Sequence, residues 1–425
     1  MSGRLFCYYG DDFTGSTDAL EALAANAVPS VLFLDPPDER MLTRFGDCRA
    51  IGVAGESRSN GPAWMSERLP EIFRRLKSLG ASICQYKVCS TFDSSSEYGS
   101  IGRALEIGQE VFGNPYVPIV VGAPSLKRYV LFGNLFAAGA GSIHRIDRHP
   151  TMRRHPVTPM DESDLRLHLA RQTRRRIALL DILALHGDDP GSKLDELLVD
   201  KPDAVLFDGL DRASLLATGR LLAVHSPARQ MFCVGSSGLT YALIEYWRSV
   251  GVIPPDPTAG KLEPVDRLIV ISGSCSPATE GQIRRAISDG FCGIRIDTQA
   301  PERALAGALE ALKEGRSVAL YTALGPRDCG ESPGGSALGS RLGILLRNLL
   351  LQSGVRRAVI AGGDTSSHSV RQLGIEALTY VAKLAPGAPL CRGHSANPAM
   401  NGLELALKGG QVGSENFFDI ALRGE

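Results

Sequence analysis

The stretch from Tyr8 to Ala27 constrains the fold of this chain most strongly. An apolar run, Leu5 to Tyr9, meets a turn at Gly10 and is followed by two adjacent carboxylates. A segment rich in Gly, Ser and Thr then leads into apolar residues at helical spacing, such as Leu20 and Leu23. The pattern predicts a buried strand, an acidic turn and the start of a helix. In open α/β sheets, ligands usually bind at such a point.

The two carboxylates are Asp11 and Asp12. Two neighbouring negative charges at a strand end are costly unless a cation, a metal ion or a polar substrate interacts with them. A single Asp at this place is as readily explained as a helix cap. The pair, followed by a cluster of hydroxyl residues, favours a functional role, and the capping interpretation stays open for each residue alone.

Four predicted strands in the first half of the chain end in polar loops, which read "GDDFTGS", "ESRS", "KVCSTFDSS" and "APSLKRY". Strands that alternate with helices predict a parallel sheet, whose loops converge on one edge. These loops carry seven charged residues: Asp11, Asp12, Arg58, Lys87, Asp93, Lys127 and Arg128. The sequence therefore predicts a hydroxyl-rich pocket of mixed charge for a small polyhydroxylated anion.

Two segments interrupt the α/β rhythm. Residues 134–160 are basic, contain proline and three histidines, and lack metal-ligand spacing, which predicts an ordered loop packed against the pocket. Ser249 to Asp266 holds four prolines and two glycines, which predicts a linker. We expect a substrate domain over 1–250, a linker over 251–265 and a nucleotide domain over 266–425. Each domain should be a mainly parallel sheet flanked by helices, with the active site in the cleft between them.

Three loops in the second half are rich in Gly, Ser and Thr: "SGSCSPAT", "AGGDTSS" and "KGGQVGSENF". Glycine lets the backbone approach a phosphate, and the helix that follows offers free N–H groups. The loops therefore predict an anion or nucleotide site that includes Ser272, Ser274 and Gly363. A P-loop is excluded because its nearest match, "GPRDCGES", has Glu331 in place of lysine. No GxGxxG follows a strand, which argues against a dinucleotide dehydrogenase.

Composition limits the other classes of protein. Length indicates two or three domains. Lys+Arg and Asp+Glu both number 46, which gives no support for a nucleic-acid or acidic-membrane partner. Nine scattered cysteines form no zinc spacing, and those in apolar runs should be buried in a reducing compartment: Cys7, Cys84, Cys233 and Cys292. Without a signal-peptide pattern or a long apolar stretch, we expect a soluble, cytoplasmic protein. A homodimer is compatible with the sequence, which does not fix the oligomeric state.

At these motifs the chain resembles the four-carbon acid sugar kinase family. "DDFTGSTDA", "SRS", "YKVCSTFDSS", "GSSGL", "SGSCSPAT", "AGGDTS" and "LALKGGQVG" follow in the family's order, from about residue 5 to the end. The resemblance implies ATP-dependent 4-phosphorylation of compounds such as threonate, erythronate or 3-oxo-tetronate. It implies that the sugar acid contacts Asp12, Arg58, Lys87, Val88, Cys89 and Ser90. It implies that ATP contacts Ser272, Gly362, Gly363, Asp364, Thr365 and Gly410.

Two departures from the family pattern bear on the substrate. Where many relatives have an "IDSTLRGN" form, this chain has "VCSTFDSS", which is closer to the branch that acts on oxo-tetronates or on branched 3-oxo acids such as 3-oxo-isoapionate. "KGG" at Lys408 to Gly410 replaces the more usual "KSG". The kinase interpretation is unaffected, and the identity of the acid stays open.

The expected mechanism is an in-line attack by a terminal hydroxyl on the γ-phosphate of ATP. Asp12 would orient or deprotonate that hydroxyl, with Asp93 as second choice, and Arg58 and Lys87 would neutralise the substrate carboxylate. Mg²⁺ would bridge the phosphates. Asp364 is a candidate to order the metal or its waters, or a simple cap, and no metal ligand is assigned.

Two other functions would need only part of this residue pattern. A non-catalytic protein that senses a sugar acid and a nucleotide would not need a carboxylate at the reacting hydroxyl. A lyase that uses Lys87 as a Schiff base would not need the glycine loops of the second half.

Overall fold

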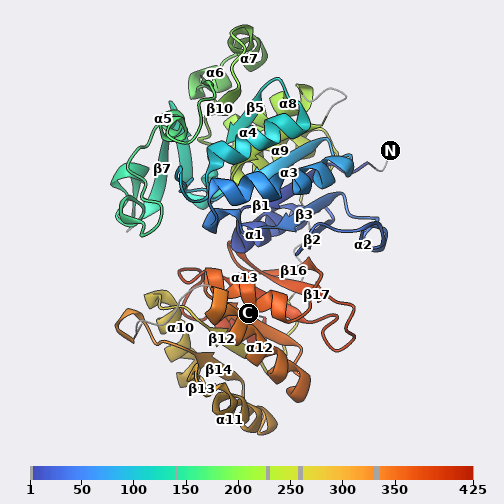
Figure 1. Ribbon diagram of the computed structural model, residues 1–425, viewed down its shortest axis with the longest axis vertical. Coiled ribbons are helices and arrows are strands. Elements are labelled where there is room, and N and C mark those ends of the chain that lie inside the picture. The colour runs from blue at the N-terminus through green and yellow to red at the C-terminus, as the bar shows by residue number, and fades with distance from the viewer. Residues whose placement is uncertain (1–2, 140, 226–229, 257–261, 329–335, 425) are drawn as a thin grey trace. The chain divides into compact units, whose positions relative to one another are not determined.

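The computed structural model describes residues 3–139, 141–225, 230–256, 262–328 and 336–424 (Figure 1). The chain forms two compact units, one of Met1–Ser30 with Pro36–Pro257 and one of Val31–Asp35 with Thr258–Glu425. Residues 257–261 of the predicted linker lie outside the described residues. The sequence-based division places Val31–Asp35 in the first domain, whereas the structure groups them with the second unit.

The first unit is built on a parallel sheet of seven strands, as predicted. In spatial order its strands are β3 (Ala50–Ala54), β1 (Phe6–Gly10), β4 (Ile83–Lys87), β11 (Met231–Gly235), β5 (Val117–Val120), β10 (Ala204–Phe207) and β9 (Ile177–Leu180). Strand β1 is buried along its whole length. A strand covered by helices on both faces reads as a continuous apolar run, which explains why this strand was visible in the sequence.

Helices cover both faces of this sheet. They are α1 (Phe13–Ala24), α2 (Glu39–Arg44), α3 (Pro62–Ser78), α4 (Ile101–Phe112), α5 (Leu165–Ala170), α6 (Ile182–His186), α7 (Pro190–Val199), α8 (Arg212–Val224) and α9 (Ser237–Ser249). α3 packs on α4, whereas α1 and α8 pack on α9. The crossovers through α3 and α8 run in opposite directions along the sheet, and right-handed crossovers of this kind place their helices on opposite faces.

Three further strands form an antiparallel sheet, namely β6 (Arg128–Leu131), β7 (Asn134–Gly139) and β8 (Ser142–Arg145). The prediction of a loop from residue 134 onward is therefore wrong for β7 and β8. At the turn between β6 and β7, Phe132 and Gly133 both have positive φ, which suits the right-handed twist of a hairpin. The buried carboxylate of Asp208 fixes this turn by accepting their N–H groups at 2.5 and 2.9 Å.

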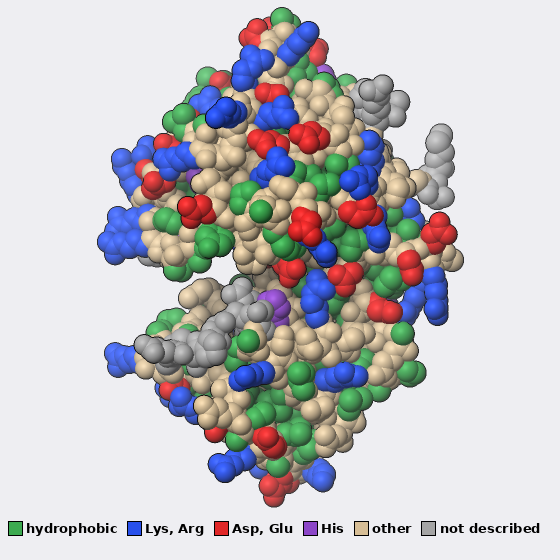
Figure 2. Space-filling model, viewed as in Figure 1, with side chains coloured by type: hydrophobic (Ala, Val, Ile, Leu, Met, Phe, Trp, Pro, Cys, Tyr) green, Lys and Arg blue, Asp and Glu red, His purple; other side chains and the backbone are tan. Residues whose placement is uncertain are grey.

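Beyond β8 the chain forms two 3₁₀ turns, η3 (Ile146–Arg148) and η4 (Met152–Arg154). Figure 2 shows Lys and Arg side chains at the margin of the first unit where Figure 1 places this sheet. The exposed cations of the two 3₁₀ turns are Arg148, Arg153 and Arg154. Elsewhere on the visible face, both signs of charge are interspersed.

The second unit has five parallel strands, β13 (Cys292–Arg295), β14 (Val318–Tyr321), β12 (Ile269–Ser272), β15 (Arg357–Ala361) and β18 (Glu404–Lys408). Antiparallel strands continue the sheet, namely β17 (Ala388–His394), β16 (Ala377–Ala385) and β2 (Ser30–Phe33). The pairing of β2 with β16 explains why residues 31–35 belong to this unit.

Helices of the second unit are α10 (Pro277–Ser288), α11 (Pro301–Lys313), α12 (Ser336–Ser353), α13 (Gly363–Gln372) and α14 (Phe417–Arg423). Part of the core lies between this sheet and the helices α10 and α14, where Ile283, Phe291 and Phe417 meet Val270 and Val359. Among the predicted buried cysteines of the chain, Cys7, Cys84 and Cys233 are buried and Cys292 is half-buried. In the part of the chain that the structure describes, no helix has the length and apolar character to cross a bilayer.

Candidate functional site

The acidic turn after β1 is built around Arg58. Asp12 is the N-cap of α1, and its Oδ1 accepts the N–H of Gly15 at 2.6 Å. Arg58, in the 3₁₀ turn η1 (Ser57–Ser59) after β3, donates from Nε and Nη2 to the two oxygens of Asp11 at 3.0 and 2.7 Å. Its Nη1 donates to Oδ2 of Asp12 at 2.7 Å. The predicted neighbours therefore lie together, and the capping interpretation of Asp12 is confirmed.

Burial and charge act in opposite directions on this group. Burial raises the pKa of Asp11 to about 6, although the positive charge of Arg58 works against that rise. Burial alone would lower the pKa of Arg58, but the charges of Asp11 and Asp12 outweigh it and raise that pKa. The Asp12 side chain is 29% exposed and that of Asp11 only 4%. Of the two carboxylates, Asp12 is therefore the one that a ligand can reach.

Lys87, the last residue of β4, does not point into open solvent. Its side chain is 2% exposed, and Nζ lies 3.3 Å from Oδ2 of Asp18 and donates to the Val88 carbonyl at 3.1 Å. The hydroxyl of Ser237, the first residue of α9, donates to the same Asp18 oxygen. Sequence reasoning did not select Asp18 or Ser237, although "GSSGL" and "TGSTDA" contain them.

The loop after β4 carries the remaining predicted acid-site residues. Val88 is buried and its N–H donates to the Gly235 carbonyl, so its backbone serves the sheet. Cys89 and Ser90 are half-buried. Asp93 accepts the Thr91 hydroxyl. Burial alone would raise the pKa of the Asp93 carboxyl, but the charge of Arg58 and the Thr91 hydroxyl hold it below the usual range. Asp93 is thus an ionised neighbour of the Arg58 cluster at neutral pH.

The two cations predicted from "SLKRY" differ in their surroundings. Lys127 is exposed, whereas Arg128, at the start of β6, is half-buried. Nη1 of Arg128 donates to the carbonyls of Leu126 and Lys127 at 3.1 and 3.2 Å. Burial lowers the pKa of Arg128, and the Cys89 thiol is the neighbouring group whose charge raises it. Arg128 and Cys89 are therefore in electrostatic reach of each other.

In the second unit, the three glycine-rich loops follow β12, β15 and β18, which are adjacent parallel strands. Gly362 follows β15, and its φ of 122° lies in a region that favours glycine. The N–H of Gly362 donates to the Lys408 carbonyl at 2.9 Å, and that of Gly273 donates to the Ala361 carbonyl at 3.1 Å. The three loops therefore lie at the same edge of this sheet.

Serine hydroxyls order the loop between β12 and α10. Oγ of Ser272 accepts the N–H of Ser274 at 3.2 Å, and Oγ of Ser274 accepts the N–H of Ser276 at 3.2 Å. Ser276 caps α10. A Cβ on Gly410 would lie 2.6 Å from Oγ of Ser274 and 3.1 Å from Cβ of Ser276, so only glycine fits there without displacing this loop. The backbone at Gly410 is therefore held directly against the predicted nucleotide loop.

Lys408, the last residue of β18, is a buried cation that sequence reasoning did not place in the site. It is fully buried, and Nζ donates to Oγ1 of Thr279 at 3.0 Å. Thr279 in turn donates to the Gly410 carbonyl at 2.8 Å. Burial lowers the pKa of Lys408 to about 8. Among the described residues no carboxylate pairs with its ammonium. The "KGG" motif was the available signal, but a pattern of letters does not reveal burial.

The predicted residues Asp364 and Thr365 begin α13, but their side chains lie outside the described residues. Within the described part of the chain, no group of three or more His, Cys, Asp or Glu side chains could hold a metal ion. Mg²⁺ usually keeps several waters and binds through one or two carboxylates together with substrate phosphates. The donor set therefore fits a metal that arrives with the nucleotide, and does not fit an ion caged by protein alone.

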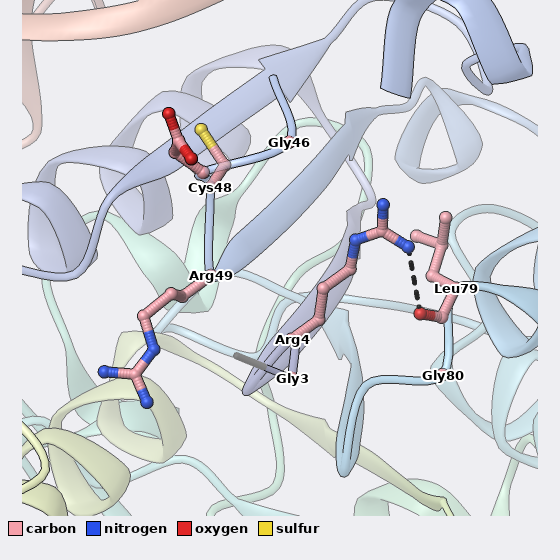
Figure 3. Close-up of a pocket in the computed structure, with 8 residues that line it drawn as sticks. Gly3, Arg4, Gly46, Cys48, Arg49, Leu79 and Gly80 are labelled. Atoms are coloured by element: carbon pink, nitrogen blue, oxygen red, sulfur yellow. Dashed lines mark hydrogen bonds between the residues drawn. The ribbon is translucent and has the colours of Figure 1, made fainter. Parts of the chain in front are cut away.

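A cavity of about 770 Å³ lies away from these residues (Figure 3). Its lining comes from segments that precede β1, β3 and β4, including Arg4, Arg49 and Gly80. The acid-site residues follow the same parallel strands, so the cavity is at the opposite edge of the sheet. Nη1 of Arg4 donates to the Leu79 carbonyl at 3.1 Å, as Figure 3 shows, which gives this arginine a structural role.

Comparison with known proteins identifies both units. A family model described as a sugar-binding N-terminal domain matches residues 6–243. A model described as a nucleotide-binding C-terminal domain matches residues 269–418. The chain therefore belongs to the four-carbon acid sugar kinase family, whose members are ATP-dependent phosphotransferases. The resemblance seen in the motifs is confirmed.

Two relatives cover almost the whole chain. The 3-oxo-isoapionate kinase of Paraburkholderia graminis is 46% identical, over 100% of this chain and 95% of its own. A 3-oxo-tetronate kinase of Cupriavidus necator is 31% identical, over 97% of this chain and 95% of its own. A solved structure from Salmonella typhimurium LT2 shares the fold, with a TM-score of 0.79, 24% identity and 98% coverage of each chain. These kinases leave no place for the lyase alternative, and the ion pair of Lys87 with Asp18 also argues against a Schiff base.

Proposed function

We propose that this protein transfers the γ-phosphate of ATP to a terminal hydroxyl of a branched 3-oxo sugar acid of the 3-oxo-isoapionate type. The observation that carries the substrate class is the 46% identity to a kinase of that name, against 31% or less for the 3-oxo-tetronate kinases with which it was compared. The "VCSTFDSS" loop is compatible with this class and equally with 3-oxo-tetronate as substrate. The sugar acid binds to the first unit, predicted as 1–250, and the nucleotide binds to the second, predicted as 266–425.

Asp12 is the group that acts on the acceptor hydroxyl. Its carboxylate is 29% exposed, and its orientation is set by Arg58 and by the N–H of Gly15. Asp12 accepts the hydroxyl proton while the substrate oxygen forms a bond to the γ-phosphorus and the bond to the β,γ-bridging oxygen breaks, which leaves ADP. Asp93 is the second candidate for this role. Arg58 has two N–H groups without a carboxylate partner, and these are available to substrate hydroxyls.

The nucleotide phosphates bind to the glycine loops after β12, β15 and β18, with Ser272, Ser274, Gly362, Gly363 and Gly410 in contact. The glycine and serine residues of these loops support this assignment, because small residues let a phosphate approach the backbone closely. Mg²⁺ accompanies the phosphates and supplies charge neutralisation there. Asp364 and Thr365 complete this part of the proposal.

The enzyme acts in the cytoplasm, where ATP is available. The homodimer with which the sequence is compatible is tested by light scattering.

The experiment is a substrate panel with ATP and Mg²⁺, in which ADP release gives kcat/KM for each acid. The panel contains 3-oxo-isoapionate, 3-oxo-tetronate, threonate and erythronate. We expect 3-oxo-isoapionate to have the highest kcat/KM. A higher value for 3-oxo-tetronate would move the protein to that substrate class. If none of the acids in the panel causes ADP release although an acid binds tightly, the sensing protein is favoured instead.

A further inference from the structure

The carboxylate cluster at the acid site lacks the positive charge that an anionic substrate requires. Among the described residues, Asp11, Asp12, Asp18 and Asp93 face Arg58 and Lys87, and the imidazole of His155 also acts on Asp93. With all four carboxylates ionised, this cluster is net negative. A substrate carboxylate placed beside it is repelled unless a further cation faces it.

Neither cation of the cluster can meet this need directly. The fork of Arg58 formed by Nε and Nη2 is occupied by Asp11, and its Nη1 is bonded to Asp12. The ammonium of Lys87 is buried and bonded to Asp18 and to the Val88 carbonyl. The sequence suggested that Arg58 and Lys87 neutralise the substrate carboxylate. In the structure, carboxylates of the protein itself already neutralise these two cations.

Arg128 is a further cation in the same region, and two of its guanidinium nitrogens, Nε and Nη2, are not engaged. Its Nη1 is bonded to two carbonyls, but Nε is buried and has no acceptor, and Nη2 has none among the described residues. No described carboxylate forms an ion pair with it. A buried donor without a hydrogen-bond acceptor costs free energy. Such a donor in Arg128 therefore indicates a ligand that accepts its hydrogen bond.

The position of Arg128 matches this role. It begins β6, directly after the loop that follows β5, and its charge is felt by the Cys89 thiol. Cys89 also raises the pKa of Arg58, so this residue is in electrostatic reach of both guanidiniums. Asp208 holds the β6–β7 turn by its hydrogen bonds to Phe132 and Gly133, which fixes the strand that carries Arg128.

We propose that Arg128 binds the carboxylate of the sugar acid through its Nε and Nη2 groups. The arrangement repeats the one that Arg58 makes with Asp11, a planar fork on a carboxylate. Arg58 then orients the acidic pair, and Arg128 selects acids over neutral sugars. This inference rests on the proposed function of the first unit.

The test compares wild type with Arg128→Gln and Arg128→Lys, using 3-oxo-isoapionate and its neutral carboxamide as alternative acceptors. Losing a charge-assisted fork should raise the KM for the acid roughly 10- to 100-fold. The KM for ATP and the kinetics with the carboxamide should stay unchanged. Arg128→Lys keeps the charge and loses the fork, so its rise in KM should be smaller. The matched control is Arg145→Gln on β8, whose guanidinium already pairs with Asp147.

An active wild type together with an unchanged acid KM in Arg128→Gln would overturn the assignment of Arg128 alone. If Arg128→Gln does not fold, as judged by its melting temperature, Arg128→Lys decides, and an unchanged acid KM there has the same consequence. A wild type that phosphorylates no acid of the panel would overturn the proposed function itself. The two failures are thus distinguishable.

Discussion

Arg58 holds Asp11 in a two-pronged ion pair, with Nε to Oδ2 at 3.0 Å and Nη2 to Oδ1 at 2.7 Å. The backbone reinforces it, because the N–H of Arg58 donates to the Asp11 carbonyl at 3.0 Å. β1 and the turn after β3 are thereby joined at both side-chain and main-chain level. Since Arg58 also reaches Asp12, the ion pair sets the orientation of the carboxylate that faces the acceptor.

Removing Arg58 should therefore affect stability as well as activity. Arg58→Ala leaves the buried Asp11 carboxylate without its partner, which should lower the free energy of unfolding by about 3 kcal/mol. The double variant Arg58→Ala/Asp11→Asn removes the stranded charge and should recover much of this loss. Urea unfolding of the three proteins measures it. Equal stability of the single and double variants would show that Asp11 does not need Arg58.

The acid limb of the activity profile should report on Asp11. Its pKa in the folded protein is about 6, above the value of 3.8 for a free carboxyl, because the group is buried. Above about pH 6 the carboxylate accepts both bonds from Arg58, and below it the protonated form releases them. We expect kcat/KM to fall as the pH drops through about 6.

The ionisation of Asp11 should also change the stability of the fold, in the direction opposite to its effect on activity. Between pH 4 and 6 the folded protein keeps a proton that the unfolded chain has released, so the contribution of Asp11 to stability falls as the pH rises through that window. Asp11→Asn should flatten this part of the curve and remove the acid limb near pH 6. An unchanged limb in that variant would assign it to another group.

The acidic turn could be predicted because its signal is local. Gly10, Asp11, Asp12 and the first turn of α1 are adjacent in sequence, and a strand followed by acids and a helix start has one common meaning in α/β folds. The contact of Ser237 with Asp18 joins residues 219 positions apart, so no local pattern contains it. Only the packing of α1 on α9 brings the two together.

Other failures have their own physical reasons. β7 and β8 were missed because frequent glycine and basic residues hide the alternation of a strand, and because the sheet is small and largely half-exposed. The pairing of Arg58 with Asp11 was also missed, because it depends on the register of β1 and β3, which no local pattern contains. The sequence placed these charges at one edge of the sheet, and only the structure shows which of them neutralise one another.

Asp12→Asn tests the proposed base. The amide keeps the size of the side chain, and Asn caps a helix about as well as Asp. A general base typically contributes about 10² to 10⁴ in rate, so kcat should fall by that factor while the KM for ATP stays the same. The matched control is Asp38→Asn, which alters the N-cap of α2, where Oδ1 accepts the N–H of Met41 at 2.8 Å. Near wild-type kcat in a folded Asp12→Asn would pass the role to Asp93.

Gly410→Ala tests the nucleotide loop. The new Cβ would lie 2.6 Å from Oγ of Ser274, so the serine loop before α10 must shift. We expect the KM for ATP to rise, while the binding of the sugar acid, measured by calorimetry, stays the same. Gly281→Ala is the control, because its Cβ would meet only Glu415 at ordinary contact distances. Equal ATP kinetics in the two variants would remove Gly410 from the nucleotide site.

We expect Lys408 to lower the stability of the nucleotide-free protein and to strengthen nucleotide binding. Burial lowers its pKa to about 8, from about 10.5 in an unfolded chain, so the unfolded state binds more protons between these values. Stability therefore rises with pH through that window, and below pH 8 the cost of the buried charge is fully present. A structural lysine would be expected to stabilise the fold. A lysine kept for the phosphates stabilises it only when the nucleotide is bound.

Lys408→Met separates these cases because the side chain stays apolar and of similar length. At pH 7 we expect a higher melting temperature without nucleotide, by about 2 to 4 °C for each kcal/mol regained. This gain should shrink as the pH is raised toward 10. The affinity for ADP should fall about tenfold or more, since a cation near the glycine loops is lost. Lys383→Met on β16, an exposed lysine, is the control and should change neither quantity. A lower melting temperature with unchanged ADP affinity would make Lys408 a purely structural residue, held by its bond to Thr279.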